Sequence, residues 1–362
     1  MLFTLAHSAK ITRILFDAEW SWVIEDASNY SSYEVTDNDV VMLCQFAVAT
    51  TLLCGVAEAS RHTNLDQESL FNKIAYFIER NIIVPASDNK SRLRSERSPD
   101  LVEKWSEFGW AAAANYHRYC YDFPFHENDE DGLLGTRTAM EAYSAIVPDC
   151  DRFKVTNDSS DVVALVNPYD VDFDEILLND NYSANVHALL SLSFGVVKKI
   201  PCPWKGEPLC FRTSPSGGAR HPTEGYYISL DQARCESRWF HIQVEPLCLA
   251  RLCAPADISI LHKLFPRHLS EAPFLAKSLI VLTSVWTRNM YRYREPRTFR
   301  SVHMDIGHMA ATIEAIASRL NLSTYAHYGF LESDLAEFLG IDMIFESPQM
   351  VIAVGSKESN VL

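Results

Sequence analysis

The chain has 362 residues, 48% of them hydrophobic, and a formal net charge of −15. This length and composition allow two or three domains with sizeable cores and exclude an intrinsically disordered chain. The acidic charge argues against a broad nucleic-acid-binding surface. Nine Cys without a CxxC pair offer no zinc spacing and are typical of reduced thiols, so we expect a cytoplasmic protein without a metal site.

The first helix of the chain is expected after one or two short strands. Residues 9–24 alternate loosely between apolar and polar and predict one or two strands, and residues 36–39 hold several possible helix N-caps. The uncharged run at 40–57 is near the minimum length for crossing a bilayer, but it contains Gln45 and two Thr. We therefore expect a buried core helix reaching about residue 59, and no membrane span.

A second helix and a short strand complete an expected N-terminal domain over residues 1–90. A helix start at 63–66 precedes apolar residues at helical spacing from Leu70 to Ile78, and residues 81–85 predict a short extended piece. Such a unit suits a winged-helix-like α/β domain. It is either a module that recognises a peptide or a plain packing domain.

Residues 91–160 are expected to form a linker and a helical region. Residues 87–100 are polar and charged and end in a Ser-Pro-Asp turn signal, which predicts a linker. Residues 101–121 predict one helix rich in aromatic residues and Ala. The acidic stretch at 126–132 does not complete a calcium-loop pattern, so we expect a solvated loop.

The remaining residues, 161–362, predict a larger domain in which strands and helices both occur. We expect, in chain order, a strand at 161–168, a helix at 186–194 ending at Gly195, a core strand at 225–230, a strand running into a helix at 240–252, a helix or strand at 274–286, helices at 308–320 and 331–339, and a strand at 351–354.

A polar loop before the core strand is the least ordinary stretch of this domain. Residues 211–224 read FRTSPSGGARHPTE. Pro215 lacks a backbone donor and the pair Gly217-Gly218 favours conformations that other residues avoid, so the stretch predicts a tight loop. Exposed backbone N–H groups, hydroxyls and a nearby Arg suit a phosphate or a flat polar heterocycle. The alternative is an ordinary Gly/Ser/Pro turn.

A second unusual stretch, residues 288–308, concentrates positive charge in an acidic chain. Five Arg alternate with Tyr and Phe, and the motif Asp305-Ile306-Gly307-His308 is expected to open the amphipathic helix that follows. Arg makes bidentate contacts with phosphate or carboxylate and stacks on flat rings. The alternative is a solvated basic face. No GxGxxG after a strand, Walker loop or GxSxG elbow is present, so nothing favours a Rossmann site or a serine hydrolase.

The two stretches together resemble the azoline-oxidase-type, thiazole/oxazole-forming branch of the FMN-dependent nitroreductase superfamily, and within it a group of peptide-maturation dehydrogenases. The resemblance rests on RTSPSGGARHP, the Arg/Tyr run and D-x-G-H, and it covers residues 162–357. It implies an α+β nitroreductase-like FMN-binding fold, with a central mixed, mainly antiparallel sheet flanked by helices. It also implies an obligate homodimer with FMN at the dimer interface.

The resemblance carries over to individual residues. Where the family has an Arg-rich start, residues 172–181 hold no Arg, so we expect Arg297, Arg300 or Lys357 to bind the FMN phosphate instead. The family's Lys-Tyr pair falls on Tyr293 and Arg294, which become the catalytic candidates, and neighbouring Arg charges would favour Tyr293 as an acid/base. The remaining FMN-binding candidates are Arg212, Ser214, Pro215, Ser216, Gly217, Gly218, Gly307, His308 and Gly355.

The resemblance implies an FMN-dependent oxidoreductase that acts on a ribosomally synthesised peptide during its maturation. Hydride would pass from the peptide to flavin N5 while a base removes an adjacent proton. The implied partners are the precursor peptide, a second copy of the chain and other peptide-maturation enzymes, with no nucleic acid and no membrane. Two alternatives remain: an NAD(P)H-dependent small-molecule nitroreductase or flavin reductase, and a non-catalytic flavin-fold partner of a peptide-modifying complex.

Overall fold

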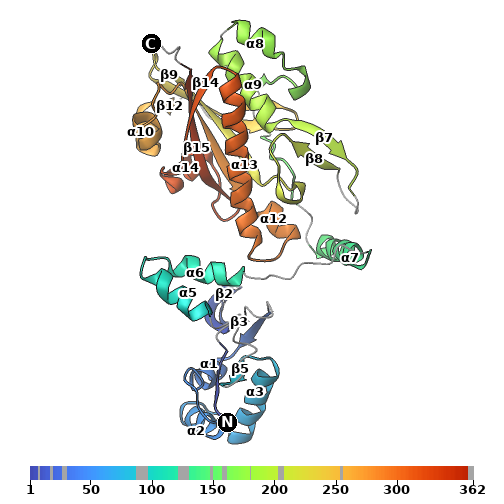
Figure 1. Ribbon diagram of the computed structural model, residues 1–362, viewed down its shortest axis with the longest axis vertical. Helices are drawn as coiled ribbons and strands as arrows, with labels where there is room; N and C mark the ends of the chain where they lie inside the picture. Colours follow the sequence, from blue (N-terminus) through green and yellow to red (C-terminus); the bar gives the residue numbers. More distant parts are fainter. Residues whose placement is uncertain are drawn as a thin grey trace. The chain divides into compact units, whose positions relative to one another are not determined.

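The computed structural model divides the chain into two compact units, residues 1–125 and 126–362, each described here by itself (Figure 1). The structure describes residues 1–6, 9–16, 19–26, 31–86, 97–120, 130–146, 150–156, 161–179, 181–202, 208–252 and 256–357.

The first unit combines two small antiparallel sheets with helices. Strands β2, β3 and β4 pair in that order, and β1 pairs with β5. Helices α1, α2 and α3 pack with them around a core that includes Ile24, Met42, Phe46, Leu70 and Phe77. The elements are β1 (Phe3–Leu5), β2 (Ala9–Phe16), β3 (Glu19–Asp26), β4 (Ser31–Val35), α1 (Asp37–Cys44), α2 (Leu52–His62), α3 (Gln67–Glu79), β5 (Ile83–Pro85), α5 (Arg97–Ser106) and α6 (Ala111–Tyr119).

The apolar run expected as one long helix is two helices, α1 and α2. The chain leaves the helix after Cys44 because the backbone of Thr50 exchanges two hydrogen bonds with Phe3, at 2.7 and 2.8 Å. The Thr51 side chain then accepts from the Cys54 N–H and begins α2. The expected starts at residues 36–39 and 63–66 are confirmed, since Thr36 and Asp66 cap α1 and α3. Among the described residues, no helix has the length and apolarity that a membrane crossing requires.

Two expectations for the helical region are corrected. The single helix expected at 101–121 is two, α5 and α6, separated at Gly109, whose φ of 76° is a conformation that glycine adopts readily. Residues 87–96 of the expected linker lie outside the described residues. Residues 97–100, the rest of that linker, belong to helix α5. Residues 126–129 of the expected acidic loop also lie outside the described residues, and 130–132 open helix α7.

The second unit is built around one eight-stranded sheet in the order β14-β15-β13-β9-β10-β11-β6, with β12 beside β10. Every pairing in it is antiparallel among the described strands. Its elements are α7 (Glu130–Ile146), β6 (Val162–Ala164), α8 (Phe173–Asn179), α9 (Tyr182–Phe194), β7 (Val196–Ile200), β8 (Leu209–Arg212), β9 (Thr223–Asp231), β10 (Glu236–Gln243), β11 (Cys248–Arg251), β12 (Ala256–Asp257), α10 (Ser259–Leu264), α11 (Pro266–Ser270), β13 (Ser278–Val285), α12 (Trp286–Arg292), α13 (Thr298–Arg319), β14 (Leu322–His327), α14 (Glu332–Leu339) and β15 (Glu346–Ser356).

Helices cover both faces of this sheet (Figure 1). On one face α9 and α13 bury residues such as Leu189 and Ile313 against the sheet, and on the other α10 and α14 contribute Leu261 and Leu335. The expected α+β architecture is therefore confirmed. The core strand at 225–230 is also confirmed, because it lies within β9, which has strands on both sides.

The expectations for the individual elements of this unit are met in part. Residues 240–252 do not run into a helix but form the hairpin of β10 and β11, and residues 274–286 hold strand β13. Helix α13 begins at Thr298, well before residue 308, so the Asp305-Gly307-His308 motif lies inside the helix and does not open it. The expected helix at 331–339 is confirmed, closed by Gly340 at a φ of 66°.

Candidate active site

The polar loop between β8 and β9 folds tightly and is tied to helix α13. Gly218, Ala219 and His221 have positive φ values of 63°, 53° and 49°, and the latter two are unusual for residues with a side chain. The Ser216 hydroxyl donates to Asp305 at 2.7 Å and accepts from the His221 N–H at 2.9 Å. The loop conformation is thus held by hydrogen bonds that reach across to the helix.

Asp305 is the helix residue that holds the loop. Its carboxylate is 4% exposed and also accepts from the Gly217 N–H, at 3.2 Å. Burial raises the pKa of Asp305, and the hydrogen bonds from Ser216 and Gly217 oppose that shift. Two of the donors that the sequence suggested for a ligand, the Ser216 hydroxyl and the Gly217 N–H, are therefore used inside the chain.

A cavity of about 320 Å³ opens beside this loop at the start of α13, and we call it the cofactor cavity because residues expected to bind FMN line it. It brings together Gly217, Gly218, Tyr293, Arg297 and Arg300, all of which were predicted site residues. Thr298, Ser301, Met304 and Glu295 complete its lining. The positive end of the α13 dipole and two Arg side chains make it a suitable place for an anion.

Tyr293 lies directly over the loop. A Cβ atom added to Gly218 would stand 2.1 Å from the Tyr293 hydroxyl oxygen, so only glycine allows the phenol to approach this closely. The Arg292 guanidinium carbon lies 5.0 Å from the centre of the Tyr293 ring, within cation–π range. Arg297 pairs with Glu295 at 3.4 Å. Tyr293 therefore combines a fixed position with a positive surrounding.

Four predicted residues of the loop itself do not line the cavity: Ser216, which is bonded to Asp305, and Arg212, Ser214 and Pro215. Ser214 and Arg212 are buried and Pro215 is exposed. Arg212 donates to the Thr223 carbonyl at 3.2 Å, while its Nε and Nη2 atoms have no hydrogen-bond partner among the residues that the structure describes. Burial lowers the pKa of Arg212 to about 10. Arg212 thus lies beneath the loop as a buried cation.

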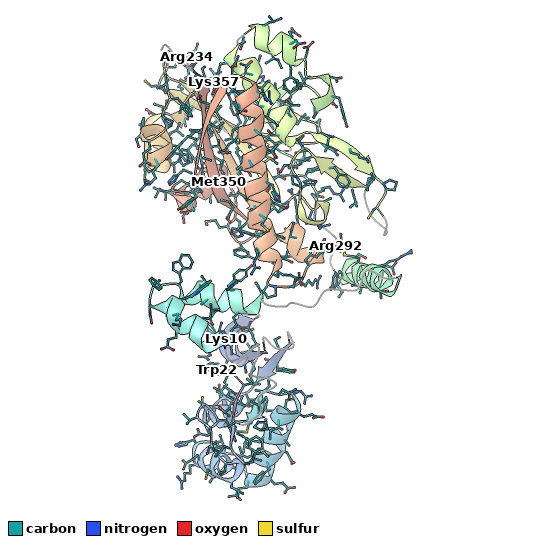
Figure 2. The ribbon with its side chains drawn as sticks, in the orientation of Figure 1. Lys10, Trp22, Arg234, Arg292, Met350 and Lys357 are labelled. Atoms are coloured by element: carbon teal, nitrogen blue, oxygen red, sulfur yellow. The ribbon has the colours of Figure 1, made fainter. Side chains whose placement is uncertain are left out.

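The later predicted residues lie along and beyond α13. Gly307 and His308 are exposed on that helix, and a Cβ atom on Gly307 would meet nothing within 4 Å. Gly355 is in β15, and the Lys357 N–H donates to the Asn321 carbonyl at the far end of the helix. At 1.5 Å per helical residue, that end is roughly 30 Å from Arg300. Figure 2 labels Lys357 and Arg292 near opposite ends of α13. Within one chain, therefore, Gly355 and Lys357 do not reach the cofactor cavity.

The Arg/Tyr run of residues 288–300 is divided, because Arg288 belongs to the core and not to a ligand site or a solvated face. Arg288 is 2% exposed and pairs with Glu224 at 2.5 Å, and Glu224 also contacts His241 at 3.1 Å. Burial alone would raise the pKa of Glu224, but the charge of Arg288 and the hydrogen bond from His241 hold it well below its usual range. Arg288 is thus a structural cation.

The buried charges continue into a second group that sequence reasoning missed. Lys154 pairs with Glu346 at 2.9 Å, and the Tyr226 and Thr283 hydroxyls each donate to Glu346 at 2.7 Å. The Lys154 N–H also donates to Glu224 at 3.1 Å, which joins the two groups. We call these residues, with Arg288 and His241, the buried charge cluster. No local pattern predicts it, because its members are far apart in sequence.

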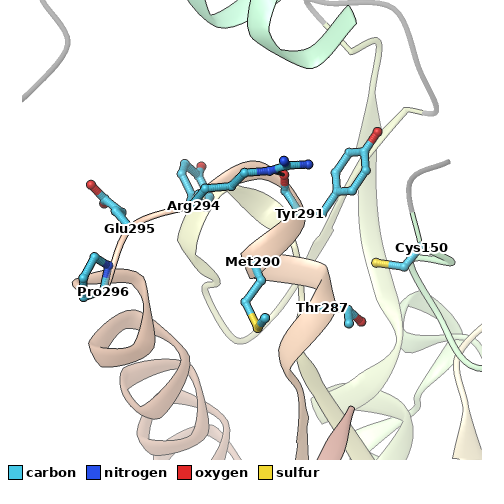
Figure 3. Close-up of a pocket in the computed structure, with 8 residues that line it drawn as sticks. Cys150, Thr287, Met290, Tyr291, Arg294, Glu295 and Pro296 are labelled. Atoms are coloured by element: carbon cyan, nitrogen blue, oxygen red, sulfur yellow. Dashed lines mark hydrogen bonds between the residues drawn. The ribbon is translucent and has the colours of Figure 1, made fainter. Parts of the chain in front are cut away.

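A second, larger cavity of about 690 Å³ adjoins the cofactor cavity (Figure 3). It shares Tyr293 and Glu295 with the cofactor cavity. Its other lining residues are Cys150, Thr287, Met290, Tyr291, Arg294 and Pro296. Arg294 was predicted as a site residue, whereas Cys150, Thr287 and Met290 carry no signal that would have marked them. Tyr293 therefore contributes to the lining of two adjoining cavities.

Comparison with known proteins points to one family for this unit. Residues 186–356 match the model of the nitroreductase family. The trifolitoxin-processing protein TfxB of Rhizobium leguminosarum bv. trifolii is 32% identical over 151 residues, 40% of each chain. MJ1384 of Methanocaldococcus jannaschii, named as a nitroreductase, is 27% identical over 147 residues, 41% of this chain and 71% of that protein. The match thus spans less than half of the trifolitoxin-processing protein.

Two solved structures also align with parts of this chain. A protein from Anabaena variabilis described as a nitroreductase aligns over 68% of this chain and 46% of its own, with 21% identity and a TM-score of 0.48. The E. coli microcin synthetase McbBCD complex with truncated pro-MccB17 aligns over 72% of this chain and 94% of the matched chain, with 17% identity and a TM-score of 0.39. The family expected from the two motifs is confirmed, and the trifolitoxin-processing relative supports the azoline-oxidase-type branch. Residues 186–356 of this chain are a domain of the nitroreductase family.

Proposed function

We propose that the chain is an FMN-dependent oxidoreductase, a dehydrogenase, that acts on a ribosomally synthesised peptide during its maturation. The observation that carries the proposal is the cofactor cavity, where two Gly, two Arg and Tyr293 converge inside a nitroreductase family domain. A processing role is extended to this chain from one relative, whose name assigns it to the processing of trifolitoxin.

The residues around the cofactor cavity fit FMN. A Cβ atom on Gly217 would meet only Ser301, at 3.7 Å, so the glycine leaves open space that a larger residue would fill. Arg297 and Arg300, at the first turn of α13, suit a phosphate group. When bound, FMN would supply the hydride acceptor for the dehydrogenation.

Tyr293 is our candidate for proton transfer. Its hydroxyl is held over Gly218, and Tyr293 lines both the cofactor cavity and the second cavity. The Arg292 guanidinium carbon lies 5.0 Å from the centre of the Tyr293 ring, and Tyr293 in its phenolate form would take up the proton that the substrate loses as hydride leaves. Proton removal at a positioned group accelerates such reactions by roughly two to four decades.

We further propose a homodimer with FMN between its subunits. Gly355 and Lys357 lie at the end of α13 away from the cofactor cavity, so a second copy is needed if they are to contribute to the same site. Phe299 and Met304 leave apolar surface exposed at the start of the helix, at 48% and 57% exposure, as an interface requires. Light scattering should give twice the mass of the chain, and a monomer at micromolar concentration with FMN bound would contradict the dimer.

Recognition of the precursor peptide is proposed for the first unit, as a winged-helix-like domain, together with contacts to other maturation enzymes. Removal of residues 1–90 should weaken peptide turnover while FMN stays bound in the second unit. If turnover of the peptide is unchanged after this truncation, the first unit has another role.

The absorption spectrum of the purified full chain tests the proposed cofactor directly. Flavin bands in stoichiometric amount are expected, and mass spectrometry of the released compound should identify FMN. Reduction of the bound flavin by a peptide substrate, and not by NADH or NADPH, distinguishes the peptide dehydrogenase from a small-molecule nitroreductase. A protein that lacks flavin after purification and after incubation with FMN would instead be a non-catalytic partner.

A further inference from the structure

The second cavity offers a binding surface with mixed chemistry. Its lining combines the apolar side chains of Met290 and Pro296 with the rings of Tyr291 and Tyr293 and one cation, Arg294. Its volume of about 690 Å³ lies within the range typical of small-molecule pockets. Because Tyr293 lines both cavities, a molecule bound here would touch the group that we propose for proton transfer.

Arg294 is held in place but is not neutralised. Its guanidinium carbon lies 3.7 Å from the centre of the Tyr143 ring, and its Nε donates to the Tyr291 carbonyl at 3.4 Å. Figure 3 shows the side chain extended toward Tyr291. In the part of the chain that the structure describes, no carboxylate lies within 4.0 Å of it as an ion-pair partner. An exposed cation without a counter-charge, in a chain of net charge −15, attracts an anion.

Two other Arg residues of the same run, Arg288 and Arg297, each have a carboxylate as an ion-pair partner. Arg288 is neutralised by Glu224, and Arg297 lies 3.4 Å from Glu295. Glu295 also lines the second cavity, but its carboxylate pairs with Arg297, which lines the cofactor cavity. Arg294 is left to present its charge to whatever occupies the second cavity, next to the apolar wall of Met290 and Pro296.

We propose that the second cavity binds the substrate through an apolar side chain and an adjacent carboxylate, and that Arg294 holds the carboxylate. This inference rests on the proposed peptide dehydrogenase. The carboxylate is either the C-terminus of the peptide or the side chain of an Asp or Glu. Arg294 is in this view a substrate-binding residue, and it selects acidic segments over neutral ones.

Binding of small probes to the full chain tests the inference without turnover. Isothermal titration calorimetry compares N-acetyl-phenylalanine with its amide, which reports on a terminal carboxylate. It also compares N-acetyl-phenylalanyl-glutamate amide with the glutamine analogue, which reports on a side-chain carboxylate. A charge-assisted contact should make the acid of at least one pair bind about ten-fold more tightly than its neutral partner. The pair that shows the preference identifies the source of the carboxylate.

Substitutions locate the preference in the cavity. Arg294→Gln should reduce the affinity for the acid about ten-fold, to that of the neutral probe, and leave the neutral probe unchanged. Arg234→Gln removes the same charge from an exposed turn at the other end of the domain (Figure 2) and should change neither affinity. Met290→Trp, at a side chain that is 58% exposed, should fill the cavity and weaken both probes.

Equal affinity for acid and neutral probes, or a preference that persists in Arg294→Gln, would overturn the inference. Flavin content is measured on the same samples, so the two proposals fail separately. If the chain binds FMN but binds the acid and neutral probes equally well, only the proposed role of the second cavity is contradicted. A chain that prefers the acid through Arg294 but never binds FMN contradicts only the proposed dehydrogenase.

Discussion

The buried charge cluster and the cofactor cavity both take Arg residues from the run at 288–300, yet they differ in how deeply these charges are buried. In the cluster, Arg288 and Glu224 are almost fully buried and each has a partner of opposite charge. At the cavity, Arg297 lies 3.4 Å from Glu295 and is only partly buried, and it shares the lining with Arg300 and two Gly residues. An Arg that is buried with its counter-charge belongs to the fold, whereas an Arg in the wall of a cavity is within reach of a ligand.

The largest effect is expected on the buried side of this comparison. Arg288→Met leaves the Glu224 carboxylate buried without its main counter-charge, which should lower the free energy of unfolding by about 3–5 kcal/mol. Urea unfolding followed by circular dichroism measures it. Replacing both residues, Arg288→Met with Glu224→Gln, should recover a large part of the loss because no unpaired charge remains. A loss below 1 kcal/mol in the single variant would mean that the pair is not part of the stable core.

A comparable effect, on rate and not on stability, is expected at the boundary between the two cavities. Tyr293→Phe keeps the ring over Gly218 but removes the proton-accepting oxygen, so FMN should stay bound while flavin reduction by the peptide slows by two to three decades. That corresponds to a barrier increase of about 3–4 kcal/mol. Single-turnover reduction measured by stopped flow checks it. Wild-type rates in this variant would exclude Tyr293 as the acid/base.

Two substitutions on the cavity side should release the cofactor and leave the fold intact. Gly217→Leu places a side chain into the cavity, and Arg300→Ala removes a cation from its wall, so each should raise the Kd for FMN by about two decades. Fluorescence quenching of added FMN measures the affinity. Arg319→Ala, at the other end of α13, is the control with the same charge change. Full flavin occupancy in Gly217→Leu would count against the assignment of the loop.

The smallest effect concerns pH. Burial and the nearby Arg212 charge lower the pKa of His221 from 6.5 to about 3, and its Nε2 lies 2.7 Å from the Cys210 carbonyl. Between pH 6.5 and pH 3 the His221 imidazole is protonated in the unfolded chain but stays neutral in the folded chain. The free energy of unfolding therefore falls as the pH drops from about 6.5 toward 3. At pH 5 the loss from this group is about 2 kcal/mol.

Comparison of two variants isolates this contribution. His221→Gln should flatten the fall in unfolding free energy between pH 7 and pH 5, whereas His262→Gln, at an exposed position, should leave it unchanged. An unchanged pH dependence in His221→Gln would show that other groups, such as the buried His268, account for it.

Much of the fold could be predicted from the sequence because its signals are local. The cap at Thr36, the apolar strand β9 and the glycine that ends α14 each act within a few residues of the chain. The predicted helix bounds were wrong where contacts between residues far apart in sequence determine the structure. The break between α1 and α2 depends on the hydrogen bonds between Phe3 and Thr50. Helix α13 begins before Asp305, and the Asp305 side chain does not cap a helix but accepts a hydrogen bond from Ser216 of the loop.

The candidate site divides in the same way. The loop and the Arg/Tyr run could be recognised as unusual from their residue types, and the structure brings Gly217, Gly218, Tyr293 and Arg300 to one cavity. The neutralisation of Arg288 by Glu224 could not be foreseen, because the two residues are neighbours only once β9 and α12 are packed together. The second cavity depends equally on tertiary packing, since Cys150 reaches it from a distant segment.

The link between Ser216, Gly217 and Asp305 has a consequence for the kinetics of ligand binding. Because the loop is fastened to α13 by side-chain and backbone hydrogen bonds, the conformational entropy of the loop is lost when the domain folds and not when a ligand arrives. A ligand would therefore meet a receptor that already has its bound shape, and association should be a single step without a slow rearrangement. Asp305→Ala would uncouple the two walls, and the same ligand would then have to order the loop as it binds.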